Sequence, residues 1–387
     1  MATHFTQNNL PAAGGGGVYF ILQGTVPAYR LEVFRLLWES PKRVLVFAGD
    51  DYFTADLSCA AIGEPWFRPV TNLYFLRRSF MWQKDSIWRL FHCPILAVEL
   101  NPRILSTIAI CLLRKLMKKP TIGWGHVGSA ITAETFVGKV RRRMIGLSSA
   151  FVAYTSTDAA ALEKTGYAFP IFVANNGCLS EKDCTFLKGD HPRNSIVYVG
   201  RLIPEKKVCL LVEAFALFAS QNAEIPLLLE VVGAGPEKER ILQSCLKLGI
   251  SASVILRGRI SEVSCLRDVY ARSFVSVSPG YVGLSAIQSM GFGVPMLVAR
   301  DEPHSPEIEA CVDGETALFF NSDDPNDLCK ALTKAFVFRM DGEKISSFIR
   351  QKYTFESMAN AFQMAFERAT PLMSPQSPSR NNIGISP

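Results

Sequence analysis

Apolar and polar positions divide most of the chain into short apolar runs and longer segments of helical spacing, in regular alternation. Between residues 18 and 174 the apolar runs stop at loop-forming residues, and segments with apolar positions every three to four residues separate them. Because such segments connect parallel strands, the pattern predicts a doubly wound α/β sheet with ligands at the carboxyl ends of its strands. Strands are expected at 18–23, 43–48, 94–99, 121–124, 150–155 and 171–174, and helices at 31–38, 105–116, 136–148 and 156–165.

A second series of the same kind begins at residue 195, after a charged stretch without periodicity. A chain of 387 residues is too long for one ordinary core, so two domains are expected. Strands are expected at 195–199, 227–232, 254–257, 274–277, 296–299 and 317–320, and helices at 209–219, 237–248, 261–271, 307–311, 326–337 and 355–369. The predicted division is a flexible leader at 1–17, a first domain at 18–178, a linker at 179–194, a second domain at 195–354, a C-terminal helix at 355–370 and a disordered tail at 371–387.

Residues 275–299 predict a strand, a glycine loop, a short helix, a glycine turn and another strand. Ser285 followed by Gln288 three residues later predicts a capping box at the start of the helix. A glycine loop that enters a helix leaves N–H groups unpaired at the positive end of the helix dipole, which favours a phosphate there. An ordinary crossover connection without a ligand is the alternative.

Composition and charge narrow the classes of protein. Hydrophobic residues make up 48% and charged residues 20% of the chain, which is typical of a folded protein. Through Cys178 there are 19 lysines and arginines against 11 acidic residues, and 22 against 24 in the rest. The basic first half favours an anionic partner such as a membrane surface, with solvated helix faces as the alternative. The ten scattered cysteines and the few histidines predict no metal site, and no apolar run reaches the roughly 20 residues of a membrane span.

Several segments of the second half resemble the retaining nucleotide-sugar glycosyltransferases of family four, which have the GT-B fold. In that family the stretch corresponding to 275–299 carries two glutamates, and here those positions are Gly280 and Gln288. The resemblance therefore indicates a divergent member that lacks both glutamates. The other matching segments are Val199-Gly200-Arg201-Leu202 with Pro204-Glu205-Lys206, Val231-Val232-Gly233-Ala234-Gly235-Pro236, Leu256-Arg257-Gly258, Ser305-Pro306-Glu307 and Asp313-Gly314.

The resemblance and the chemistry together indicate site residues. A nucleoside diphosphate leaving group gains negative charge as the sugar departs, and fixed cations such as Arg201 and Lys206 would stabilise it. The resemblance implies a donor-diphosphate site that also includes Gly283, Leu284 and Ser285, a ribose contact at Gln288, and a catalytic role for His126 near the reacting sugar. It also implies a donor or acceptor loop at Gly24, Tyr29 and Arg30. The alternatives are a surface ion pair for the two cations, a structural role for the histidine, and helix-start packing with a solvated charge for Tyr29 and Arg30.

The resemblance implies two Rossmann-like domains facing a cleft, and a C-terminal helix that can cross back to the first domain. It also implies a metal-independent enzyme without a cofactor, which transfers a sugar to a saccharide or lipid-linked acceptor in surface polysaccharide biosynthesis. We expect a cytoplasmic protein that can bind the inner face of an anionic membrane, and no nucleic-acid partner. Basic segments at 114–119 and 139–143 would contact the lipid. Two alternatives remain: a catalytically silent GT-B protein, and a nicotinamide-dependent enzyme built on Gly233 to Pro236.

Overall fold

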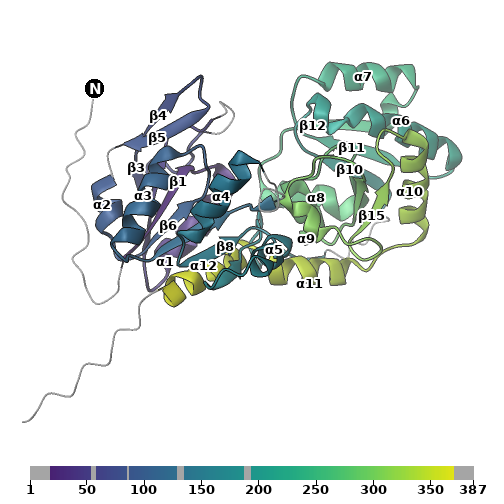
Figure 1. Ribbon diagram of the computed structural model, residues 1–387. Helices are drawn as coiled ribbons and strands as arrows, with labels where there is room; N and C mark the ends of the chain where they lie inside the picture. The colour runs from purple at the N-terminus through teal and green to yellow at the C-terminus, as the bar shows by residue number, and fades with distance from the viewer. Residues whose placement is uncertain (1–17, 54–57, 85–86, 129–134, 187–192, 370–387) are drawn as a thin grey trace, which may run out of the picture.

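Two parallel sheets, each covered by helices on both faces, form the molecule in the computed structural model (Figure 1). The structure describes residues 18–53, 58–84, 87–128, 135–186 and 193–369. The predicted leader at 1–17 and tail at 371–387 lie outside these residues. The doubly wound α/β fold class with two Rossmann-like halves is confirmed.

The first sheet has seven parallel strands in the order β3-β2-β1-β6-β7-β8-β9. A two-stranded antiparallel hairpin, β4-β5, follows the third strand. The strands are β1 (Tyr19–Thr25), β2 (Val44–Gly49), β3 (Phe67–Pro69), β4 (Thr71–Phe75), β5 (Phe80–Lys84), β6 (Leu96–Glu99), β7 (Thr121–Gly125), β8 (Ala150–Ala153) and β9 (Ile171–Val173). The helices are α1 (Leu31–Glu39), α2 (Ile87–His92), α3 (Leu105–Leu116), α4 (Phe136–Gly146) and α5 (Ser156–Lys164).

The second sheet has six parallel strands in the order β12-β11-β10-β13-β14-β15. They are β10 (Ser195–Val199), β11 (Leu228–Val232), β12 (Val254–Gly258), β13 (Ser273–Ser278), β14 (Met296–Ala299) and β15 (Ala317–Phe320). The helices are α6 (Val208–Gln221), α7 (Lys238–Lys247), α8 (Val263–Arg272), α9 (Leu284–Gly291), α10 (Pro325–Val337) and α11 (Gly342–Lys352), and a short 3-10 helix, η5, spans Pro306–Ala310. One apolar core lies under α6, α7 and α10, and another under α8, α9 and α11.

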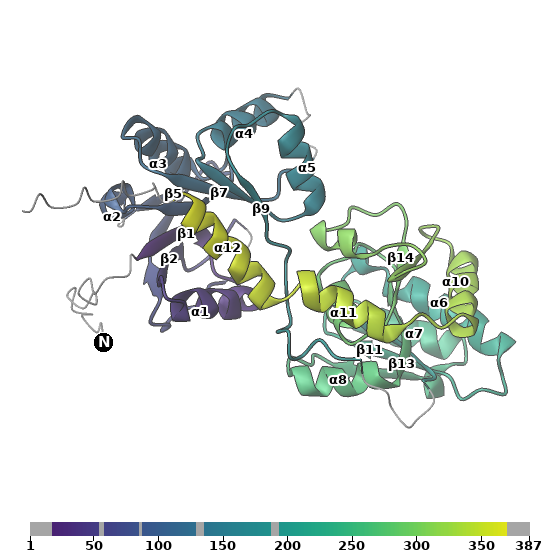
Figure 2. The same ribbon diagram turned by 90° about the horizontal axis from the view of Figure 1, so that it is seen from below.

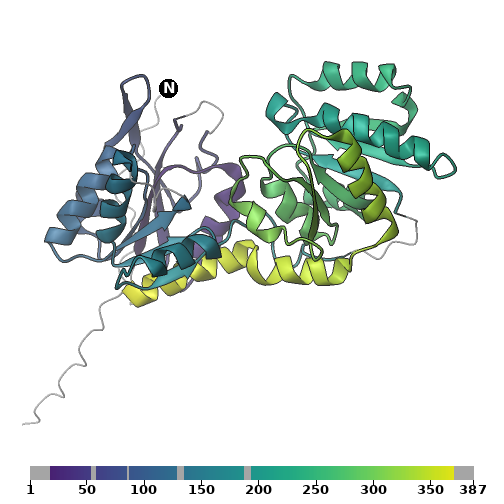
Figure 3. The same ribbon diagram turned by 45° about the vertical axis from the view of Figure 1, so that its right-hand side comes forward.

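The C-terminal helix α12 (Phe355–Ala369) leaves the second domain and packs on the first sheet beside α1 (Figure 2). The ring of Phe366 stacks on Tyr19 with centroids 4.7 Å apart, and Phe362 meets Trp124 edge to face at 5.2 Å. In Figure 3, α11 and α12 follow one another along the base of both domains. The expected crossing of this helix is therefore confirmed, and the first core contains residues from both ends of the sequence.

Several features of the fold differ from the predicted elements. Strand β3, the hairpin β4-β5 and helices α2 and α11 were not expected from the sequence. The basic segment at 114–119 also differs from the expected lipid contact, because Arg114 is buried. Its guanidinium donates to the carbonyl oxygens of Leu90 and Phe91 in α2, and to those of Cys93, Pro94 and Pro120. Arg114 therefore fastens α3 to α2, and its proposed contact with lipid was wrong. No helix in the described ranges is long and apolar enough to cross a membrane.

Candidate functional site

The structure places Gly24 near the end of β1 and not in the predicted loop. A hydrogen-bond network fixes this end of the strand, which together with the loop that follows it we call the Gly24 loop. The Gly24 N–H donates to the Glu99 carboxylate at 2.9 Å, and its carbonyl accepts from the Asn72 amide at 3.0 Å. The Tyr52 hydroxyl donates to the other Glu99 oxygen at 2.5 Å. A Cβ on Gly24 would lie 2.0 Å from the Tyr52 ring, so only glycine fits. The predicted loop residue thus lies at the carboxyl edge of the sheet, beside a carboxylate that the sequence did not single out.

Arg30 is buried, whereas its neighbour Tyr29 is exposed. The Arg30 guanidinium donates to the Tyr154 hydroxyl at 3.0 Å and to the Asn176 side-chain oxygen at 2.8 Å, and it lies 4.8 Å from the Trp124 ring centroid. A buried arginine needs such partners, because an uncompensated charge would be costly. Arg30 therefore holds the ends of several strands together, and the solvated charge weighed as its alternative is wrong.

His126 follows β7 and is oriented by Asp158 in the first turn of α5. Its Nδ1 lies 2.8 Å from an Asp158 carboxylate oxygen, which also accepts from the Val127 N–H at 3.2 Å, while the other oxygen accepts from the Gly128 N–H at 2.8 Å. Burial would raise the pKa of the Asp158 carboxyl, but the hydrogen bonds from His126 and the backbone lower it below its ordinary value. Since an ionised carboxylate only accepts, Nδ1 carries the hydrogen and Nε2 points away from Asp158. The half-exposed imidazole is thus held in one tautomer.

Arg201 and Lys206 meet at Tyr281 in the second domain. Arg201 donates to the Tyr281 hydroxyl at 3.0 Å, and the Lys206 ammonium donates to the Tyr281 carbonyl at 2.6 Å. Lys206 is 9% exposed, and no described carboxylate lies within ion-pair distance of it. Burial and then the nearby charge of Arg201 lower the pKa of Lys206 to about 8, and Glu307 opposes the change. The two predicted cations therefore form one positive site, and no surface ion pair of Lys206 with Glu205 is present among the described contacts.

The N-terminus of α9 opens beside these cations, since Tyr281 precedes its cap, Gly283, by two residues. Within the described ranges, the N–H groups of Gly283, Leu284 and Ser285 have no acceptor, and a Cβ on Gly283 would meet open space. Together with the helix dipole these groups suit a phosphate.

The capping box predicted from Ser285 and Gln288 is wrong. Helix α9 begins at Leu284, with Gly283 as its cap and no side-chain cap hydrogen bond. The Gln288 side-chain oxygen instead accepts from the buried Tyr270 hydroxyl at 3.4 Å. That bond leaves the side-chain NH₂ group of Gln288 as a donor. A ribose hydroxyl bound by Gln288 would therefore accept a hydrogen bond from it.

The missing first glutamate has a steric explanation. A Cβ on Gly280 would lie 2.1 Å from the Glu205 carbonyl oxygen and 3.0 Å from the Lys206 Cα. No side chain fits this close approach without moving the backbone that carries Lys206. The glycines of the nucleotide-like segment have a similar role, since a Cβ on Gly233 would lie 1.8 Å from the Gly200 carbonyl oxygen and one on Gly235 2.3 Å from that of Leu202. This backbone packing accounts for both glycines without a dinucleotide.

Two hydrogen bonds connect the domains next to the cationic site. The Asn176 amide donates to Glu307 at 2.8 Å, and the Ser156 N–H at the start of α5 donates to Glu309 at 3.0 Å. Asn176 also accepts from Arg30, so a continuous chain of contacts runs from Arg30 to Glu307 near Lys206. The structure thus brings the first-domain loops and the second-domain cations to one side of the interface.

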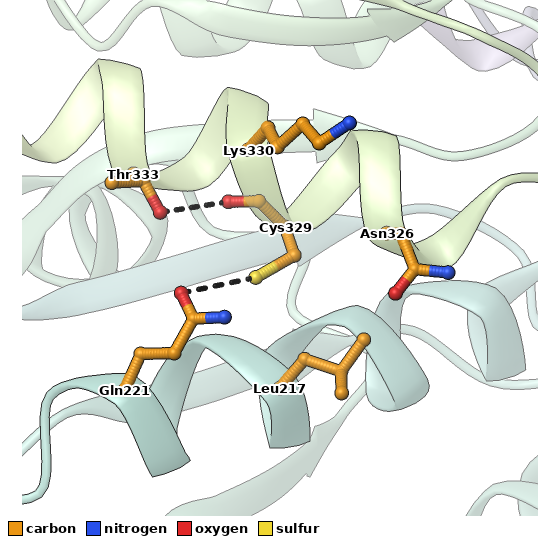
Figure 4. Close-up of a pocket in the computed structure, with 6 residues that line it drawn as sticks. All are labelled: Leu217, Gln221, Asn326, Cys329, Lys330 and Thr333. Carbon is orange, nitrogen blue, oxygen red and sulfur yellow. Dashed lines mark hydrogen bonds between the residues drawn. The ribbon is translucent and has the colours of Figure 1, made fainter.

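The remaining candidates for a site are weaker. In the part of the chain that is described, no three His, Cys, Asp or Glu side chains are grouped so that they could hold a metal ion. A cavity of about 340 Å³ lies between α6 and α10, lined by Leu217, Gln221, Asn326, Cys329, Lys330 and Thr333 (Figure 4). None of these residues takes part in the contacts around Lys206.

Sequence reasoning missed Glu99, Asp158, Tyr52 and Tyr281. Glu99 ends a predicted strand, and Tyr281 lies in the loop after one. Either position could have been used to identify the residue. The contacts of Asp158 and Tyr52, by contrast, depend on pairings 32 and 47 residues apart.

Comparisons with known proteins agree with this geometry. Residues 193–336 match the family model described as Glycosyl transferases group 1. No curated protein matches the chain. Anabaena Alr3699/HepE in complex with UDP is similar in structure at a TM-score of 0.66 and 13% identity, over 91% of this chain and 99% of that one.

Two other solved structures show the same fold. The lipopolysaccharide outer core galactosyltransferase WaaB, in its apo form, has a TM-score of 0.64 and 17% identity over 90% of this chain and 99% of its own. Sucrose-phosphate synthase from Thermosynechococcus elongatus has a TM-score of 0.59 and 16% identity over 91% and 98%. Residues 193–336 therefore match a group 1 glycosyltransferase domain, and the chain as a whole shares its fold with these solved structures.

Proposed function

We propose that this protein is a retaining glycosyltransferase that moves a sugar from a nucleoside diphosphate to a saccharide or lipid-linked acceptor in surface polysaccharide biosynthesis. The observation that carries the proposal is the positive site formed by Arg201 and Lys206 beside the open N-terminus of α9. Among the described residues no carboxylate forms an ion pair with the buried Lys206, and burial and Arg201 outweigh the charge of Glu307 in lowering its pKa. A diphosphate would supply the missing negative charge.

The same groups would act during transfer. As the sugar leaves, the terminal phosphate gains charge, and the two cations with the α9 N–H groups stabilise it without a metal ion. The leaving phosphate oxygen accepts the acceptor's proton as the hydroxyl attacks from the same face. His126, held by Asp158, presents Nε2 to the reacting sugar, and the Gly24 loop with Glu99 positions the acceptor.

The site suits a protein that works in the cytoplasm at the inner face of a membrane. The excess of basic residues before Cys178 supports an anionic surface or acceptor. UDP is bound by the structurally similar Alr3699/HepE, so uridine diphosphate is the first nucleotide to test.

A panel of nucleoside diphosphates tests the binding part of the proposal. One of them should raise the melting temperature of the protein, and Arg201→Ala should abolish that shift. Lys330→Ala, which removes a cation from α10, should keep it. If no nucleoside diphosphate stabilises the protein, the proposed donor site is wrong.

A catalytically silent nucleotide-binding protein is the second candidate, and it is favoured by Gly280 and Gln288 in place of the two glutamates. Donor turnover separates the two. Release of nucleoside diphosphate from a sugar donor, with retention at the anomeric carbon, supports the enzyme. Nucleotide binding without hydrolysis or transfer for any donor supports the silent protein.

A further inference from the structure

The hairpin β4-β5 has apolar side chains on both of its sides. On the side that faces the domain, Met81 and Tyr74 pack against an apolar cluster, and Asn72 and Gln83 lie beside them. Met81 and Gln83 are buried. The opposite positions pair Leu73 with Trp82 and Phe75 with Phe80 across the two strands. These four residues and Leu76 at the turn form an outward surface, which we call the hairpin face.

The inward side of the hairpin is bonded to the loop of the candidate site. The Gln83 amide donates to the Gln23 carbonyl at 3.0 Å and to the Asn72 side-chain oxygen at 3.1 Å. Asn72 in turn donates to the Gly24 carbonyl. Whatever contacts the hairpin face is therefore connected to the Gly24 loop by a short chain of hydrogen bonds.

The hairpin face is exposed and carries no negative charge. Leu73 is 40% exposed, Phe75 48% and Leu76 74%, on an element that projects from the first domain (Figure 1). Residues 71–84 include no aspartate or glutamate, whereas Arg77 lies at the turn and Lys84 at the base. Arg78 is paired with Asp51 at 2.6 Å, so Arg77 and Lys84 are the basic groups at the two ends of the face.

The turn of the hairpin is conformationally unusual. Leu76, Arg77 and Arg78 all have left-handed backbone angles, with φ of 49°, 53° and 63°. Residues other than glycine rarely adopt this conformation, and here three successive ones lie in the connection between β4 and β5.

We propose that the hairpin face docks on an anionic lipid bilayer and thereby holds the Gly24 loop at the membrane surface. This inference rests on the proposed function, because it brings the acceptor side of the site to a lipid-linked acceptor. Aromatic and aliphatic side chains flanked by cations suit the interface between headgroups and acyl chains. A protein partner would have to cover the apolar strip and also supply acids at both ends, whereas an anionic bilayer supplies both.

The structure favours the hairpin over the other basic segments of the first domain. Arg114 is buried, and Lys139 and Arg142 already take part in other interactions. Helix α3 does expose Leu112 and Leu116, so it serves as the competing surface in the experiment.

Co-sedimentation of the full chain with vesicles tests the inference. The wild-type protein should bind vesicles of phosphatidylcholine with about 30% phosphatidylglycerol, which mimic an anionic leaflet. Its binding should weaken as salt is added. The double variant Phe75→Ser/Leu76→Ser should lower the partition coefficient roughly tenfold or more. Arg77→Glu should lower it as well and increase the preference for neutral lipid.

Two matched variants serve as controls. Val337→Ser/Phe338→Ser removes similarly exposed apolar groups from the second domain, and Leu112→Ser/Leu116→Ser removes them from α3. Both should bind vesicles like the wild type. Loss of binding only in the α3 variant would overturn the inference, as would equal binding of the wild type to neutral and anionic vesicles.

Two further measurements keep the outcomes apart. The first is the oligomeric state in solution. If the wild type is a dimer, and the hairpin variant is a monomer that binds vesicles as well as the wild type does, the hairpin face is a contact between copies and the inference is wrong. Stabilisation by a nucleoside diphosphate, measured without vesicles, should be unchanged in every hairpin variant. Loss of vesicle binding with that stabilisation retained supports the inference, whereas absent nucleotide stabilisation in the wild type would reject the proposed function alone.

Discussion

The titration of Lys206 gives the sharpest test of the candidate site. Burial, followed by the charge of Arg201, lowers its pKa to about 8 from an ordinary value of 10.5. A diphosphate binds the ammonium form better than the neutral amine, because only the ammonium carries a charge and a third hydrogen for donation. Binding should therefore weaken as the pH rises through 8.

The magnitude follows from the fraction of Lys206 that is protonated. At pH 9, one unit above the pKa, about one lysine in eleven carries its proton, so the dissociation constant of a nucleoside diphosphate should rise roughly tenfold between pH 7 and pH 9, or about 1.4 kcal/mol. The terminal phosphate titrates near pH 6, so its charge is constant over this range.

The stability of the free protein should change in the opposite direction. The folded pKa lies below the unfolded pKa, so between the two values the unfolded chain binds more protons and stability rises with pH. The cost of burying the ammonium is fully present below pH 8, and the part relieved by pH 9.5 is about 1.5 kcal/mol.

Isothermal titration calorimetry between pH 7 and pH 9.5 measures both affinity and proton uptake, if two buffers of different ionisation enthalpy are used. Lys206→Met should bind more weakly at pH 7 and show no dependence on pH up to 9.5. Lys330→Ala should retain the wild-type slope. A dissociation constant of the wild type that does not change with pH, or an equal slope in Lys206→Met, would refute the reasoning.

Three further substitutions test other parts of the site and the fold. Gly280→Ala should lower stability by more than about 2 kcal/mol, because its Cβ would overlap the Glu205 carbonyl oxygen; an unchanged melting temperature would show that the loop moves freely. Gln288→Ala should raise the donor Michaelis constant and lower the free energy of unfolding by about 1 kcal/mol, because Gln288 forms no cap bond in α9 but the buried Tyr270 hydroxyl loses its acceptor; a lower melting temperature with unchanged donor kinetics would contradict a role in donor binding. Arg114→Met should lower the free energy of unfolding by more than about 3 kcal/mol, since several buried carbonyls lose their donor; denaturant unfolding that leaves stability within 1 kcal/mol, about the range of a surface change, would contradict it.

The parallel strands were predictable because they are buried on both faces. Such strands have nearly continuous apolar sequences between glycine-rich loops, and the expected ranges 195–199, 296–299 and 317–320 coincide with β10, β14 and β15. Helices α3 and α12 also begin and end where the periodicity predicts. These elements depend mainly on local pattern, so the sequence alone was sufficient.

The hairpin β4-β5 was not predictable for a physical reason. Its inward positions carry Met81 beside Asn72 and Gln83, and its outward positions carry Leu73 and Trp82, so apolar residues occur on both faces. A pattern of apolar positions therefore could not distinguish its inner face. The capping box failed differently, since Gly283 with an extended backbone caps α9 two residues before Ser285, the expected cap.

The candidate site was predictable only for residues within recognisable segments. Arg201 and Lys206 lie in one such segment, and the structure brings both to Tyr281. Glu99 and Asp158 act through contacts with distant residues, which depend on strand order and not on local sequence.

The crossing of α12 onto the first sheet has a consequence for synthesis on the ribosome. Phe362 and Phe366 of α12 complete the core that contains Tyr19. The first domain therefore cannot complete its core until α12 has left the exit tunnel. The second domain, whose sheet is contained between Ser195 and Phe320, can assemble while the first is still missing a helix. We therefore expect the order of maturation during translation to be the reverse of the order along the chain, with the first domain exposed to chaperones and proteases until α12 has been synthesised.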